Sequence, residues 1–303
     1  MGTEIKLKGD KVIEQIPSIK DKALRINLNE NIYGTFAEIG AGQETVRHVF
    51  RSGGSSGTIA KAMSAYDKDF SDAVYGTEKD GRYVTESRLK KMLSHEVDLI
   101  EKRLSREKHP NKMFFSYANT VATIDFAKQF KGHGWVGISY QIEPDEDYNE
   151  IIIHIRFKET DVRLQQETLG ILGVNLIYGA YYKYNDPKRL LRDLYDHLDK
   201  DQLEIDTINF SGPRFADVDN RLMSLQLVKN GMTDAVMFNP DGKNILPAAI
   251  LYKKNILAFR GSFRPVTKVN MDMYEKSLKM FLNENKVEKE NTLVVFEITL
   301  SNL

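Results

Sequence analysis

The spacing of apolar residues along this chain predicts several helices. From Thr85 to Glu107, apolar side chains recur every three or four residues, which indicates a helix with one buried face. From Leu169 to Tyr182 they occupy nearly every position, so we expect a helix that is buried all round. Weaker patterns of the same period predict helices over residues 59–66, 187–198, 217–229 and 272–283.

Alternation of apolar and polar residues, with many β-branched side chains, predicts the strands. The clearest are residues 151–157, IIIHIRF, and residues 135–141. The acidic loop between them, 143–150, contains Pro144, so we expect the two strands to form an antiparallel hairpin. Similar stretches predict strands at 23–28, 113–117, 203–210, 235–238, 256–259 and 292–300.

The order of these elements predicts an α/β fold. We expect a mixed, largely parallel sheet flanked by helices, with the antiparallel hairpin near 135–157. From residue 203 onward strands and helices alternate, which is typical of a doubly wound sheet. Residues 1–22 read as a charged lead-in, and 23–303 as one large domain with a possible subdivision near 183–202.

Charge and composition exclude some classes of function. Lys plus Arg and Asp plus Glu both number 43, so no net field attracts a polyanion, and we expect no nucleic-acid partner. The chain has no cysteine, which excludes thiolate metal sites and cysteine nucleophiles. The start is charged and lacks the apolar stretch of a signal peptide, and no apolar run is long enough to span a bilayer. We therefore expect a cytoplasmic protein without a membrane partner.

The segment Glu38–Tyr66 is the strongest candidate for a ligand site. It contains two glycine-rich turns, each followed by a predicted helix, and free N–H groups at a helix start suit a phosphate or carboxylate. The match is incomplete, because Gly57 is followed by Thr58 and Ile59 where the Walker pattern requires Lys and Ser or Thr. The alternative is a flexible loop with solvated arginines. The predicted ligand-binding residues here are Arg47, Arg51, Gly53, Gly54, Ser55, Ser56 and Thr58.

Other candidates lie at predicted strand ends, where α/β sheets assemble their sites. Arg214 could hold a phosphate, and Asp217 with Asp219 could hold a hydrated Mg²⁺ or simply cap a helix. Arg260 and Arg264 share one loop and repel each other unless an anion or acidic side chain lies between them. A carboxylate such as Glu38 would also satisfy them.

Two weak candidates for acid–base catalysis emerge. His133 lies between two glycines that could expose its ring, and Asp219 is the better placed of the two acids before the helix at 217–229. No His-Glu-x-x-His metal motif and no Gly-x-Ser-x-Gly nucleophile turn occurs, so no metal site is expected from histidine spacing.

Several long runs resemble an uncharacterised bacterial family. They include INLNENIYGTFAEIGAGQETVRHVF, QQETLGILGVNLIYGA, FSGPRFADVDNRLMSLQLVKNGMTDAVMF and RGSFRPVT. Members often carry the label nicotinate- or nicotinamide-nucleotide adenylyltransferase, or TonB-dependent receptor. Such adenylyltransferases use a His-x-Gly-His element, which is absent here, and a receptor barrel needs export and many alternating strands. The resemblance therefore implies nucleotide binding only weakly. Longer members continue beyond FEITLSNL, so it also implies a further C-terminal domain that this chain lacks.

Two functions remain open from the sequence. The first is a cytoplasmic enzyme or binding protein for a nucleotide or phosphorylated metabolite, with the phosphate at residues 53–58. The second is a non-enzymatic, self-assembling scaffold that forms a homo-oligomer, which zero net charge permits. In the first, the cofactor would be a nucleotide, with Mg²⁺ as a weaker expectation.

Overall fold

The computed structural model describes residues 15–79, 81–128 and 131–302. Internal packing divides the chain into two compact units, one of Met1–Glu204 with Asn209–Val218 and one of Ile205–Ile208 with Asp219–Leu303. The expectation of one large domain over 23–303 stays a prediction. Residues 1–14 of the expected lead-in lie outside the described residues.

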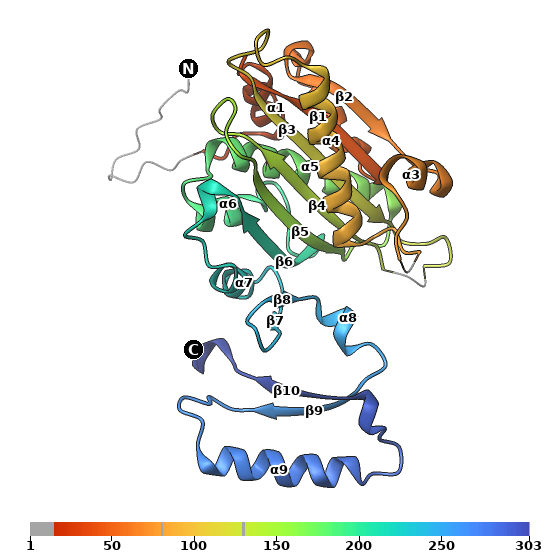
Figure 1. Cartoon of the computed structure of the whole chain (residues 1–303), viewed down its shortest axis with the longest axis vertical. Helices are drawn as coiled ribbons and strands as arrows, with labels where there is room; N and C mark the ends of the chain where they lie inside the picture. The colour runs from red at the N-terminus through yellow and green to blue at the C-terminus, as the bar shows by residue number, and fades with distance from the viewer. Residues whose placement is uncertain (1–14, 80, 129–130, 303) are drawn as a thin grey trace. The chain divides into compact units, whose positions relative to one another are not determined.

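A six-stranded sheet with the order β2-β1-β3-β4-β5-β6 is the main sheet of the structure (Figure 1). β1 runs parallel to β2 and β3, whereas β3, β4 and β5 are antiparallel to their neighbours. The α/β fold class, the mixed sheet and the predicted hairpin are thus confirmed. The strands are β1 (Ile32–Gly40), β2 (Ile59–Ser64), β3 (Met113–Ala122), β4 (His133–Tyr140), β5 (Asn149–Phe157) and β6 (Leu203–Ser211).

Helices cover both faces of this sheet. Leu89 and Leu93 of α4 lie against Gly137 of β4, and Gly173 of α5 lies against the Tyr117 hydroxyl of β3. Gly137 pairs with Ala118, one residue along from Tyr117, so the two helices cover opposite faces. α5 is buried along most of its length, as predicted. The helices are α1 (Ile19–Asn27), α2 (Gln43–Arg51), α3 (Lys68–Tyr75), α4 (Glu86–Arg103), α5 (Val162–Tyr182) and α6 (Pro187–Asp193).

Two short elements were predicted with the wrong type. Residues 23–28, expected as a strand, belong largely to α1, where Ser18 caps the helix and Ala23 and Ile26 are buried at helical spacing. Residues 59–66, expected as a helix, form β2 instead. Ile59 and Met63 are four residues apart, a spacing that places them on one side of a helix and also on one side of a strand. Pairing with β1 decides for the strand.

The second unit has its own small sheets. β9 (Asn255–Arg260) and β10 (Thr292–Glu297) run parallel and are joined through α9 (Lys268–Leu282), which packs on β9. The alternation of strands and helices is confirmed, but the expected doubly wound sheet is wrong, because these strands form separate two-stranded sheets. The remaining elements are α7 (Asn220–Lys229), β7 (Met237–Phe238), β8 (Asn244–Ile245) and α8 (Pro247–Leu251).

Candidate functional site

The two glycine-rich turns of the sequence lie at opposite edges of the main sheet. Gly40 ends β1 and leads into α2, whereas residues 53–57 follow α2 and precede β2. Because β1 and β2 are parallel, the end of one and the start of the other lie at different edges. We call these the carboxyl edge and the amino edge. The two turns therefore cannot form one cradle.

At the amino edge, the predicted anion loop is a turn rather than a helix start. Gly53 and Gly54 have φ values of 82° and 72°, and residues 55–57 form one 3-10 turn, η1 (Ser55–Gly57). Thr58 is buried, and its hydroxyl donates to the Asn27 carbonyl over 3.3 Å. That hydroxyl is therefore already used within the fold.

The two arginines expected beside this loop point to other roles. Arg47 forms an ion pair with Glu44 one turn earlier in α2, at 2.9 Å. Arg51 is exposed in the last turn of α2, where a cation stabilises the helix dipole. Neither residue lines the pocket that the loop helps to form. Their role in binding stays a prediction.

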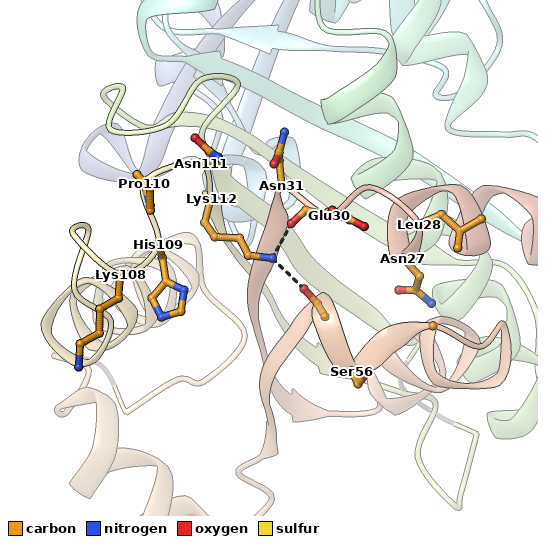
Figure 2. A pocket seen from close by; sticks show the side chains of 12 residues that line it. Asn27, Leu28, Glu30, Asn31, Ser56, Lys108, His109, Pro110, Asn111 and Lys112 are labelled. Atoms are coloured by element: carbon orange, nitrogen blue, oxygen red, sulfur yellow. Dashed lines mark hydrogen bonds between the residues drawn. The ribbon is translucent and has the colours of Figure 1, made fainter.

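A pocket of about 580 Å³ opens at the amino edge, and we call it the amino-edge pocket (Figure 2). One side carries Gly54, Ser56 and Gly57 of the predicted loop, together with the end of α1. The other side is the loop 108–112, which the sequence analysis did not single out. Its only signal was two lysines and a histidine within five residues, a composition common in solvated loops.

A cleft of about 550 Å³ lies at the carboxyl edge, and we call it the carboxyl-edge cleft. β1, β2 and β3 are parallel and end here, and Gly40, Tyr66 and Ala122 near their ends line the cleft. β1 lies between β2 and β3, and the chain leaves β1 through α2 and β2 through α3 and α4. Such a reversal of strand order is where open α/β sheets bind ligands.

Positively charged and aromatic side chains line this cleft. Lys68 at the start of α3 and Arg82 supply positive charge, and Tyr66 is 82% exposed. Ser71 lies in the first turns of α3 and is 1% exposed, and its hydroxyl has no hydrogen-bond partner among the described residues. A buried hydroxyl without a partner is unfavourable, so this group suits a bound polar ligand.

Hydrogen bonds orient several of these side chains. A hydrogen bond with Tyr83 raises the pKa of Lys68 and fixes the ammonium beside the ring. Asp67 caps α3 by accepting from the Phe70 N–H at 2.9 Å. His133, the predicted acid–base residue, lines the cleft, and its Nδ1 lies 3.2 Å from Nε2 of His154. One ring must donate to the other, so the pair holds a proton at the start of β4.

A buried carboxyl group lies near the end of β1. Glu38 is 1% exposed, and its Oε2 accepts from the Ser64 hydroxyl at 2.9 Å. Burial raises the pKa of Glu38 to about 7. Oε1 has no hydrogen-bond partner among the described residues. The sequence analysis used Glu38 only as a possible partner for arginine, because nothing in the sequence indicated its burial.

The other predicted site residues have partners within their own units. In the first unit, Arg214 pairs with Glu146 at 2.7 Å and Glu143 at 2.8 Å. In the second, Asp219 caps α7 by accepting from the Arg221 N–H at 2.9 Å, which agrees with the capping alternative. Arg260 pairs with Glu297 at 2.7 Å, and Arg264 is exposed. Ligand binding by these residues stays a prediction.

No family model and no curated protein matches this chain. Among solved structures it is similar to a competence-damaged protein (CinA) superfamily protein from Enterobacter cloacae, with 11% identity, a TM-score of 0.38 and coverage of 59% of this chain and 99% of that one. A competence/damage inducible protein from Agrobacterium tumefaciens gives 14%, 0.32, 48% and 83%. A CinA superfamily protein from Klebsiella pneumoniae gives 9%, 0.34, 52% and 93%. None of these is described as a TonB-dependent receptor, and the likeness is too low to assign an activity.

Two further searches of the structure concern membranes and metals. Among the described residues, no helix combines the length and apolar character needed to cross a bilayer. Within the same residues, no group of three His, Cys, Asp or Glu side chains is arranged to hold a metal ion.

Proposed function

We propose that the chain binds a mononucleotide-like metabolite in the carboxyl-edge cleft. The observation that carries this proposal is the buried, unpartnered hydroxyl of Ser71 beside the cations Lys68 and Arg82, at the ends of three parallel strands. A cleft of about 550 Å³ lies within the usual range for small ligands.

The lining residues suggest how each part of such a ligand would bind. Lys68 and Arg82 suit a phosphate, because ammonium and guanidinium groups form strong charge-assisted hydrogen bonds to it. The exposed ring of Tyr66 offers a flat apolar surface on which a base could stack. Ser71 and Asp67 would then face the hydroxyl groups of the sugar.

The test is isothermal titration calorimetry with adenosine 5′-monophosphate, adenosine and inorganic phosphate as probes. The monophosphate should bind more tightly than either fragment, because it uses both the cations and the ring. Lys68→Gln and Tyr66→Ala should each weaken its binding by about ten-fold. Lys108→Gln, a lysine change at the other edge, is the matched control and should alter affinity less than about two-fold.

Two outcomes would oppose the proposal. One is an absence of saturable binding of the monophosphate. The other is an equal loss of affinity in Lys68→Gln and Lys108→Gln, because that would place the ligand away from the carboxyl edge.

A further inference from the structure

The amino-edge pocket gathers positive charge from one loop. Lys108, His109 and Lys112 all line it, and among the described residues none of the three forms an ion pair. One carboxylate, that of Glu30, lines the same pocket, and its residue is exposed. Charge of one sign without a carboxylate partner in a concave site favours an anion from solution.

Lys112 is held in place at the pocket. Its ammonium donates to the Glu30 carbonyl and, over 3.3 Å, to the Gly57 carbonyl (Figure 2). It also lies 5.2 Å from the centroid of the Tyr33 ring. Carbonyl oxygens orient an ammonium but do not neutralise it, so the positive charge remains and its position is fixed in advance.

The opposite wall leaves its backbone open to a ligand. A Cβ atom at Gly57 would meet no described atom within 4 Å, and at Gly54 the nearest would be Asn27 Cβ at 3.7 Å. Ser56, between them, is exposed and lines the pocket. An anion held by the lysines could therefore reach the hydroxyl and the main chain of this turn without a steric barrier.

We propose that the amino-edge pocket is a phosphate-binding site, separate from the carboxyl-edge cleft. Lys108 and Lys112 would supply the charge, and His109 and Ser56 would donate hydrogen bonds. The ligand class is a free phosphate ion or the phosphate group of a small metabolite. The site rests on its own lining residues and does not depend on nucleotide binding at the other edge.

The test is a titration of ¹⁵N-labelled full-length protein with inorganic phosphate and, separately, glycerol 3-phosphate at constant ionic strength. Amide resonances of residues 54–57 and 108–112 should shift saturably. The double variant Lys108→Gln/His109→Gln should weaken this binding at least about five-fold. It should fold normally, because neither side chain has a partner among the described residues. Lys68→Gln is the matched control and should leave the affinity at this pocket unchanged.

Each outcome decides the proposal. Tighter binding of phosphate assigns the site to the free ion, and tighter binding of the ester assigns it to a phosphorylated metabolite; both support the proposal. The proposal is overturned if neither probe shifts these resonances saturably, or if the double variant binds as well as the wild type.

Discussion

The two edges of the main sheet carry glycine-rich turns of opposite character. At the carboxyl edge the glycines are required by packing, since a Cβ at Gly40 would lie 1.9 Å from the Val121 carbonyl oxygen and one at Gly42 2.1 Å from the Asn119 amide. At the amino edge, a Cβ at Gly53 or Gly57 would meet no described atom within 4 Å. Glycine-rich sequence therefore marks a tightly packed strand–helix turn at one edge and an open loop at the other.

The largest effect that follows concerns Gly40. Gly40→Ala should lower the free energy of unfolding by about 4 kcal/mol or more, because the new Cβ would overlap a main-chain carbonyl and the residue has a φ of 87°. Gly57→Ala is the matched control and should change it by less than about 1 kcal/mol. Urea denaturation of both variants checks the pair, and similar losses would contradict the contrast between the edges.

The second effect concerns the buried carboxyl group near the carboxyl edge. The folded state raises the pKa of Glu38 from 4.5 to about 7, so the native protein retains a proton that the unfolded chain releases. The contribution of Glu38 to the free energy of unfolding is therefore full below about pH 4.5 and is lost as the pH rises to about 7.

Glu38→Gln should remove this dependence. By linkage, the variant should exceed the wild type in stability by up to about 3 kcal/mol near pH 8 and match it near pH 5. Glu30→Gln, an exposed carboxylate at the amino edge, is the control and should show no such difference. Urea denaturation at the two pH values provides the measurement. A constant difference between Glu38→Gln and the wild type would show that Glu38 ionises normally.

The smallest effect concerns a single tether at the amino edge. The side-chain amide of Asn27 donates to the Val49 carbonyl at 2.9 Å and to the Gly53 carbonyl at 2.7 Å. Asn27→Ala should cost about 1–3 kcal/mol, because two carbonyls lose their donor. Asn111→Ala, an exposed residue of the same pocket, should be nearly neutral. If thermal denaturation shows equal losses, the tether does not order the turn.

Much of the fold could be predicted from the sequence because its long elements have unambiguous periods. The stretches that became α4, α5 and the β4–β5 hairpin each contain enough residues to separate a period of 3.6 from a period of two. Short stretches do not. The positions of Ile59 and Met63 fit either period, and only the pairing of β2 with β1 decides between them.

The candidate sites were less accessible from the sequence, because they depend on which ends of the elements meet. The predicted loop at Gly54 and Ser56 does line a pocket, but Lys108 and Lys112 on its other wall come from a loop some fifty residues away. His133 was selected for its flanking glycines and does line the carboxyl-edge cleft. Ser71 gave no signal, because burial of a serine in an amphipathic segment cannot be recognised without the packing.

The most direct test of nucleotide binding at the carboxyl edge is chemical-shift mapping of ¹⁵N-labelled protein titrated with adenosine 5′-monophosphate. We predict saturable shifts at residues 66–71, 82–84 and 121–122, with the same dissociation constant at each. Saturation of residues 54–57 and 108–112 alone, with no change at the carboxyl edge, would contradict this assignment.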